Sequence, residues 1–341
     1  MAKPPGKSGR SGRLNPGGKK TVFVAGGLGF FGARIGQSLR QAGHQVLLGT
    51  RKTGNFPEGA GLAGVPVPMQ WEDKTQLEDV LRGSDVVVHA AGPNAKACVA
   101  DPVAAMEFCR AGTARLVEAA RRAGVQRILY ISTIHVYRAE LSGDISEESP
   151  TENPHPYAQA RLAGEREVAA GDGPENVILR FSNSFGPPVF PKADCWGLVI
   201  QDLCRQAVEQ GRLTLRGPGG QQRDFIPMGE SCRILGELVI RKLPPLGPRI
   251  YNVGSGFSLA LASVAQQIQD LCQSCLGFRP VWNPQRRPVD DPPQPDLRYR
   301  TDRLAGLGLR VSPDIRAEIQ DLLRFCQNHF GPATGAVGQE T

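Results

Sequence analysis

The sequence predicts an α/β protein built on a doubly wound parallel sheet, followed by a smaller C-terminal lobe. Two observations lead to this fold class. Short apolar segments alternate with segments of helical periodicity from about residue 21 to residue 181, and the connections between them are short. A glycine-rich stretch, GGLGFFG at 26–32, directly follows the first apolar segment. Alternation of this kind is typical of a parallel sheet with helices on both faces.

The strands of the first half are expected where short runs of apolar residues occur, because strands buried on both faces of a parallel sheet are apolar throughout. These runs are residues 21–25, 45–48, 85–89, 127–132 and 177–181. Helices are expected where apolar residues recur every three to four positions. These segments are residues 33–42, 77–81, 104–123 and 157–170.

The second half follows a looser pattern, in which proline and glycine cluster between helical segments. Helices are expected near 197–210 and 314–328, and residues 261–276 also have helical periodicity. Cys272 and Cys275 form a CxxC within that last segment. No second cysteine or histidine pair accompanies them in the sequence, so we interpret them as helix positions rather than as a zinc or redox site.

The net charge of +7 owes much to the first twenty residues, which hold six lysines and arginines among glycine, proline and serine. We expect residues 1–20 to form a disordered basic tail. A solvated leader is a simpler interpretation than a nucleic-acid contact, because the rest of the chain is nearly neutral. No apolar run in the sequence predicts a membrane span or signal peptide, and the eight scattered cysteines favour a reduced, cytoplasmic protein.

The glycines of the 26–32 stretch lie where the first strand ends and the first helix begins. A tight turn needs backbone freedom there, and a pyrophosphate must reach backbone N–H groups without side chains in the way. The spacing therefore predicts a Rossmann-type dinucleotide site, with a turn that binds nothing as the alternative. The predicted cofactor-binding residues of this turn are Gly26, Gly27, Leu28, Gly29, Phe30, Phe31 and Gly32.

The second strand ends with Thr50, Arg51 and Lys52, instead of the acid that commonly binds the ribose hydroxyls of NAD. Arginine suits a phosphate because its planar fork binds two oxygens at once. We therefore expect Arg51 to bind the 2′-phosphate of NADP, which is favoured over NAD. NAD is the alternative cofactor if Arg51 is only a solvated charge at the end of the strand.

These features belong to a set of motifs that resembles the extended short-chain dehydrogenase/reductases, the family of NAD(P)-dependent sugar-nucleotide epimerases and dehydratases. The resemblance runs from about residue 21 to residue 328. Its motifs occur in the family's order: GGLGFFG at 26–32, HAAG at 89–92, YISTIHVY at 130–137, PYAQAR at 156–161, LRFSNSFGP at 179–187, RDFIPMGE at 223–230, YNVGSG at 251–256 and RPVD at 287–290.

The resemblance implies a catalytic set. In the family a tyrosine exchanges a proton with the substrate oxygen while hydride moves to or from the nicotinamide. Tyr157 occupies that position, Thr133 occupies that of the hydroxyl that bonds the reacting oxygen, and Arg161 stands where the family has lysine. The alternative is that Tyr157 and Arg161 are only helix residues one turn apart. Four further residues correspond to the cofactor lining: Ala90, Ala91, Gly92 and Ser132.

Ile134 and His135 occupy the place where the family's dehydratases carry an Asp-Glu pair, which argues against sugar 4,6-dehydration. His135 is expected at the mouth of the pocket, as an additional acid/base, as a substrate contact or as an ordinary loop residue. Three acids that precede Tyr157 are interpreted as a solvated lip: Glu147, Glu148 and Glu152.

The family holds the pyrophosphate of its sugar nucleotide with an asparagine and two arginines. Asn183, Arg223 and Arg287 occupy those positions, and arginine is suited to phosphate oxygens. For Arg223, a salt bridge to the adjacent Asp224 is an equally weighted alternative.

We therefore expect an NAD(P)-dependent oxidoreductase or epimerase that acts on a nucleotide-activated sugar or a related hydroxy or keto compound. A non-catalytic dinucleotide sensor or scaffold is the alternative, because Arg161 replaces the family's lysine. A homodimer stays open. The expected domains are a tail (1–20), an NAD(P)-binding domain (21–185), a partly interleaved substrate lobe (186–330) and a frayed end (331–341).

Overall fold

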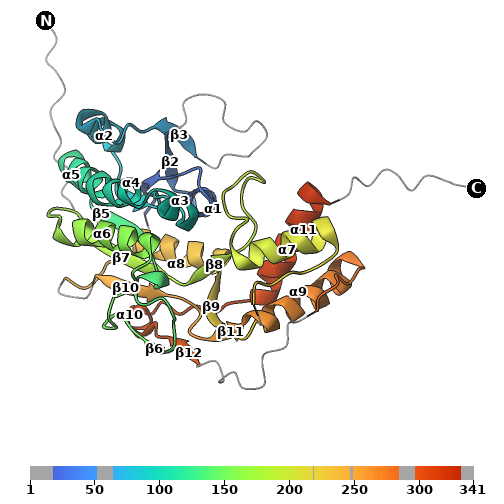
Figure 1. Cartoon of the computed structure of the whole chain (residues 1–341). Coiled ribbons are helices and arrows are strands. Elements are labelled where there is room, and N and C mark those ends of the chain that lie inside the picture. Colours follow the sequence, from blue (N-terminus) through green and yellow to red (C-terminus); the bar gives the residue numbers. More distant parts are fainter. Residues whose placement is uncertain (1–17, 52–63, 218, 246–248, 284–295, 332–341) are drawn as a thin grey trace, which may run out of the picture.

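The computed structural model describes residues 18–51, 64–217, 219–245, 249–283 and 296–331 (Figure 1). Two segments and two residues discussed above lie outside the described residues: most of the basic tail (1–17), the C-terminal stretch 332–341, Lys52 and Arg287. A central sheet with helices on both faces adjoins a lobe of helices and short strands.

The central sheet contains seven strands within the described residues, in the order β10-β7-β5-β4-β1-β2-β3. Every neighbouring pair runs parallel. The strands are β1 (Thr21–Ala25), β2 (Gln45–Thr50), β3 (Val65–Pro68), β4 (Val86–His89), β5 (Arg127–Thr133), β7 (Glu175–Phe181) and β10 (Ile250–Val253). The order changes direction between β1 and β4, as in a doubly wound sheet, so the predicted fold class is confirmed.

Helices cover both faces of this sheet because successive side chains of each strand point to opposite sides. In β1, Val22 and Val24 lie in one core, whereas Phe23 and Ala25 lie in the other. The helices α1 (Phe30–Gln41) and α8 (Met228–Ile240) cover the first core. Three helices cover the second core: α2 (Lys74–Leu81), α5 (Thr113–Ala123) and α6 (Pro156–Ala170).

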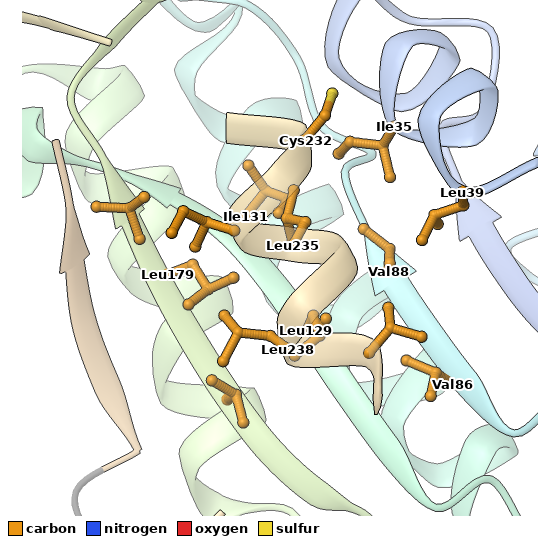
Figure 2. Close-up of a cluster of buried hydrophobic side chains, with 14 of the residues drawn as sticks. Ile35, Leu39, Val86, Val88, Leu129, Ile131, Leu179, Cys232, Leu235 and Leu238 are labelled. Atoms are coloured by element: carbon orange, nitrogen blue, oxygen red, sulfur yellow. The ribbon is translucent and has the colours of Figure 1, made fainter. Parts of the chain in front are cut away.

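Helix α8 is the main element that the sequence analysis does not predict. Figure 2 shows Leu235 of α8 beside Ile131 of β5 and Leu238 beside Leu129, and both α8 leucines are fully buried. Gly229 and Gly236 weaken the helical signal, because glycine has a low helix propensity. The chain continues from α8 to β10, so residues beyond 185 complete the central sheet.

The helix predicted over 104–123 is interrupted. It begins as α4 (Pro102–Glu107), passes through a π-helical turn (Phe108–Gly112) and continues as α5. An unpredicted helix, α3 (Ala95–Ala100), precedes it. Single π-helical turns often occur near functional sites, and this one buries Cys109 against the helix that carries Tyr157.

The lobe packs around a core of its own. Its helices are α7 (Val199–Gln210), α9 (Leu261–Leu276) and α11 (Ile315–Phe330). A small sheet joins β8 (Asn183–Phe185), β9 (Gln222–Pro227) and β11 (Ser258–Ala260); the remaining elements are β6 (Gly143–Ile145), which pairs with β12 (Leu297–Tyr299), and α10 (Asp302–Gly306). Cys272 and Cys275 lie in α9, as predicted, and the described residues contain no cluster of potential metal ligands.

The helices of the described part of the chain are amphipathic or short. None of those helices combines the length and the apolar composition that crossing a bilayer requires.

Candidate active site

A cavity of about 580 Å³ opens where several strands of the central sheet end. Its lining includes residues just after β1 (29–32) and β4 (Ala90 and Gly92). It also includes the last residues of β5 (131–133) and the end of β7 (181–182). Residues of the lobe form the opposite wall. Ligands of doubly wound sheets bind at the carboxyl ends of the strands, beside the point where the strand order reverses. The cavity occupies that position.

The glycine turn between β1 and α1 is shaped by close backbone contacts. Gly26 has a φ of +81°, and a Cβ atom there would lie 2.8 Å from the Cα of Ala91. A Cβ atom on Gly32 would lie 2.2 Å from the carbonyl oxygen of Gly26, so the helix could not start so near the strand. Gly26, Gly27 and Leu28 form the turn, whereas residues 29–32 line the cavity.

The first turn of α1 fits the pyrophosphate of a dinucleotide. Gly29 caps the helix without a side-chain hydrogen bond, and the first turn carries no acidic residue. The first N–H groups of a helix lack partners within it and attract anions. This bare turn borders the cavity, so its geometry suits a phosphate group. Arg51, at the end of β2, is exposed.

Helix α6 brings Tyr157 and Arg161 to the cavity. His155 caps this helix, because its Nδ1 accepts a hydrogen bond from the Tyr157 N–H at 3.1 Å. The guanidinium carbon of Arg161 lies 5.3 Å from the centre of the Tyr157 ring. The two residues are therefore neighbours inside the cavity as well as along the helix.

Arg161 lies among neutral groups. Its Nη1 approaches the carbonyl oxygen of Ala91 at 3.5 Å, and its guanidinium packs on Gly92, where a Cβ atom would lie 2.6 Å from Nη1. Burial and the charge of Arg161 lower the pKa of His89 to about 3, so that histidine is neutral. Burial also disfavours the charge of Arg161, but interactions with Tyr157, Tyr130 and Cys109 act in the opposite direction, and the net direction of its pKa is upward. Within the described residues, no ion pair joins Arg161 to a carboxylate.

Thr133 and Ser132 end β5 on the same wall of the cavity. The Thr133 Oγ1 accepts a hydrogen bond from the His135 N–H at 3.3 Å, which leaves its own proton free to donate to a ligand. The Ser132 hydroxyl instead donates to the buried carboxylate of Glu165, which is paired with Arg180. Ser132 can therefore only accept a hydrogen bond from a ligand.

The predicted substrate residues His135, Asn183 and Arg223 also line the cavity. Burial, followed by the charge of Arg223, lowers the pKa of His135 to about 4, whereas a hydrogen bond with Asn183 acts in the opposite direction. His135 is therefore neutral near pH 7. Its backbone is fixed, because its carbonyl oxygen accepts a hydrogen bond from Asn153 at 2.7 Å.

Two interpretations of charged residues are wrong. Arg223 does not pair with Asp224, because neighbours on β9 point in opposite directions; Asp224 is fully buried and accepts the N–H groups of Ser255 and Gly256 at 2.9 and 2.8 Å. Glu147 is no solvated lip residue. Its carboxylate accepts the N–H of Asn252 at 2.8 Å, and its side chain is only 2% exposed.

Several cavity residues are absent from the sequence prediction: Asn94, Asn153, His155 and Asp194. Asn94 and His155 lie next to recognised motifs, HAAG and PYAQAR, so their place in the sequence could have indicated them. Asp194 lies in a loop that matches no motif.

A comparison with family models decides the class of the protein. The model described as the NAD dependent epimerase/dehydratase family matches residues 22–254. The chain belongs to this family. The predicted resemblance is confirmed, and this family member is an NAD-dependent enzyme by class.

Named relatives of this family member include dehydratases and epimerases. The dTDP-glucose 4,6-dehydratase of Streptomyces niveus is 29% identical over 300 residues, which cover 82% of this chain and 84% of that protein. The human dTDP-D-glucose 4,6-dehydratase is 28% identical, over 64% of this chain and 61% of its own length. A putative UDP-glucose 4-epimerase of Methanocaldococcus jannaschii is 24% identical, over 90% of this chain and 99% of its own.

Solved structures share the fold. The UDP-glucose 4-epimerase of Thermus thermophilus, in complex with NAD, superposes with a TM-score of 0.72 at 23% identity and covers 91% of this chain and 99% of its own. DesIV, a dTDP-glucose 4,6-dehydratase from Streptomyces venezuelae with NAD and TYD bound, gives 0.70 at 25% identity over 91% and 97% of the two chains.

Proposed function

We propose that this family member oxidises a hydroxyl group of a nucleoside-diphosphate sugar by hydride transfer, with Tyr157 as acid/base, and either returns the hydride to epimerise the sugar or releases the product. One observation carries the proposal. Tyr157, Thr133 and Arg161 line the same cavity as the bare first turn of α1. A proton-transfer group and a phosphate-binding turn therefore share a single space of a size that suits a bound cofactor and sugar.

Each residue has a distinct role in this proposal. A nicotinamide cofactor held at the glycine turn would supply the hydride-transfer chemistry. The Tyr157 oxygen takes the proton from the sugar hydroxyl as the carbonyl forms and returns it in the reverse step. Thr133 donates its free proton to the same sugar oxygen and so orients it. Arg161 places a positive charge beside Tyr157 and offers N–H groups to ribose hydroxyls.

The charge of the cavity supports an anionic substrate. Arg161 and Arg223 line it, whereas Asp194 is the one carboxylate among its described lining residues. We propose that Asn183, Arg223 and Arg287 bind the substrate pyrophosphate. Relatives named for dTDP-glucose and UDP-glucose are consistent with this substrate class.

For the cofactor we propose that Arg51 favours NADP, through contact with its 2′-phosphate, although the family is named for NAD. We also propose a cytoplasmic location, which the eight free cysteines support, and we leave a homodimer as an expectation.

A non-catalytic dinucleotide sensor is the second candidate function. The observation that favours it is Arg161, which cannot give up a proton and is bulkier than the lysine of the family pattern. The convergence of Tyr157 and Thr133 on the cavity supports the enzyme instead.

Titration with NADH and NADPH, followed by nicotinamide fluorescence, tests the cofactor site. Wild-type protein and Tyr157→Phe should then be assayed with UDP-glucose, dTDP-glucose and UDP-N-acetylglucosamine. We expect both proteins to bind a cofactor, with turnover at least about 10²-fold lower in Tyr157→Phe. Cofactor binding without turnover of any sugar nucleotide by the wild type would favour the sensor. Failure to bind either cofactor, once co-purified cofactor is excluded, would overturn both functions.

A further inference from the structure

One hydrogen bond joins the two halves of the chain at the cavity. The Asn94 Nδ2, just before α3, donates to the Asp194 Oδ2 at 2.5 Å. Asp194 belongs to the loop between β8 and α7, one hundred residues further along the chain. Both residues line the cavity, so a ligand in the cavity has access to this pair.

The amide of Asn94 has a fixed orientation. Its Oδ1 accepts the N–H of Ala97 at 2.7 Å, which obliges the amide nitrogen to face away from that turn and towards Asp194. One of the two amide protons is used in the bond to Asp194, and the second is left for a ligand. The pair thus offers one amide donor whose direction is determined by the protein.

Asp194 is also held in place. Its neighbours Ala193 and Cys195 are buried, and their N–H groups form turns with the carbonyl oxygens of Phe190 and Ala193, each at 3.0 Å. Trp196, the next residue but one, packs edge-on against Phe330 of α11 with ring centres 4.9 Å apart. These anchors leave the Asp194 side chain exposed at the cavity, where its Oδ1 remains available to accept a hydrogen bond.

The pair shares its cavity with the proposed reacting groups, and the chain around Asn94 packs against them. Gly92, two residues before Asn94, packs on the guanidinium of Arg161. Cys98 of α3 belongs to the buried cluster against which Tyr157 packs. Helix α3, which Asn94 caps, therefore packs beside the helix that carries Tyr157, and both residues of the pair line the same cavity as Tyr157.

We propose that Asn94 and Asp194 read the sugar of the substrate: the carboxylate accepts a sugar hydroxyl, the amide donates to a neighbouring oxygen, and the negative charge rejects sugars that carry a carboxylate. The preferred class is then a nucleoside-diphosphate sugar with a neutral hexose, rather than a uronate. A carboxylate brought next to Asp194 would leave two like charges at one site, which is a strong element of specificity. This inference rests on the proposed function.

Binding measurements distinguish sugar recognition by Asn94 and Asp194 from a purely structural role, in which their hydrogen bond only fixes the loop that carries Asp194. Isothermal titration in the presence of oxidised cofactor would measure the affinities of UDP, UDP-glucose and UDP-glucuronate. The proteins compared are the wild type, Asp194→Asn and Asp321→Asn. The same titrations would be made with dTDP, dTDP-glucose and dTDP-glucuronate. Asp321 is an exposed acid of α11 outside the cavity lining, so its variant removes the same charge elsewhere.

We expect wild type and Asp321→Asn to prefer UDP-glucose over UDP-glucuronate by about tenfold or more, and Asp194→Asn to narrow that ratio by about tenfold with UDP affinity unchanged. Asn94→Ser, which keeps a helix cap but removes the amide, should weaken UDP-glucose severalfold and leave UDP unchanged.

An unchanged ratio of UDP-glucose to UDP-glucuronate affinity in Asp194→Asn would overturn the inference. Equal losses of affinity for UDP and both UDP-sugars would also overturn it, because a purely structural role predicts that result. If UDP-glucose and dTDP-glucose bind the wild type no better than UDP and dTDP, the proposed function fails instead, since no sugar is recognised at all. Thermal melts of each variant show whether the protein remains folded.

Discussion

The guanidinium carbon of Arg161 lies 5.3 Å from the centre of the Tyr157 ring, one turn further along α6. A cation near an aromatic ring is attracted to the ring face, more strongly where water is excluded. Gly92 provides the space, because any side chain there would collide with the guanidinium. Although arginine replaces the family's lysine, a positive charge therefore remains beside the proposed acid/base.

We expect Arg161→Lys to keep turnover within about tenfold of the wild type and Arg161→Ala to lose about 10²-fold, because only the first retains a cation beside Tyr157. Steady-state rates with a nucleotide sugar, together with cofactor titrations, would measure this. Arg166→Ala, an exposed position of the same helix, is the matched control. Full activity of Arg161→Ala would contradict the proposed role.

The cofactor preference can be tested at Arg51. We expect Arg51→Ala to weaken NADPH by about tenfold or more while NADH affinity changes little, because a hydrogen bond to a charged group contributes about 1.5–3 kcal/mol. Nicotinamide fluorescence titrations give both constants. Equal losses for the two cofactors would show that Arg51 does not read the 2′-phosphate.

Removal of one partner from the buried pair of Glu165 and Arg180 should destabilise the protein strongly. Each side chain is 5% exposed, and removal of one partner leaves an uncompensated buried charge. We expect Glu165→Ala to lower the free energy of unfolding by about 3–5 kcal/mol. Glu107→Ala, which breaks an exposed pair with Arg110, should cost at most about 1 kcal/mol. Denaturant melts that gave similar losses for both would refute this difference.

Acid should destabilise the protein partly through His89. Its pKa in the folded state is about 3, below the ordinary histidine value of 6.5, so unfolding takes up a proton below pH 6.5. Stability is therefore lost as the pH falls from about 6.5 towards 3, by about 2 kcal/mol at pH 5 from this residue. His89→Phe keeps a ring against Trp71 and Tyr130 but cannot titrate.

We expect the loss of unfolding free energy between pH 7 and pH 5 to be about 1–2 kcal/mol smaller in His89→Phe than in the wild type. Denaturant melts at the two pH values measure the difference. Parallel pH profiles would mean that folding does not lower the pKa of His89. Because the two pH values are compared within each protein, any constant cost of the substitution cancels.

The elements with an unmixed local signal were predictable from the sequence. The strand at 21–25 and the helix at 261–276 have the same bounds in the structure, because a continuous apolar run and a helical repeat each leave few alternatives. Helix α8 was missed, since its two glycines lower helix propensity and its stability comes from burial of Leu235 and Leu238 against the sheet. Such tertiary packing cannot be read from local propensity.

The candidate site divides in the same way. The residues of recognised motifs, such as Tyr157 and Thr133, line one cavity. The opposite directions of Arg223 and Asp224 were predictable in principle, since side chains alternate along a strand. Asp194 was not, because it approaches Asn94 only after the lobe has folded against the sheet, and sequence separation hides that contact.

The position of α8 and β10 in the chain limits how the protein can be truncated or recombined with its relatives. The chain leaves the sheet for the lobe and then returns to supply an edge strand and the helix that covers Leu129 and Leu179. A gene fragment ending at residue 185 would lack β10 and α8, so the part of the apolar sheet face that α8 covers would be exposed to solvent. The lobe is encoded on both sides of α8 and β10, so its exchange between homologous genes needs three crossovers, and the sheet and the lobe are expected to be inherited together.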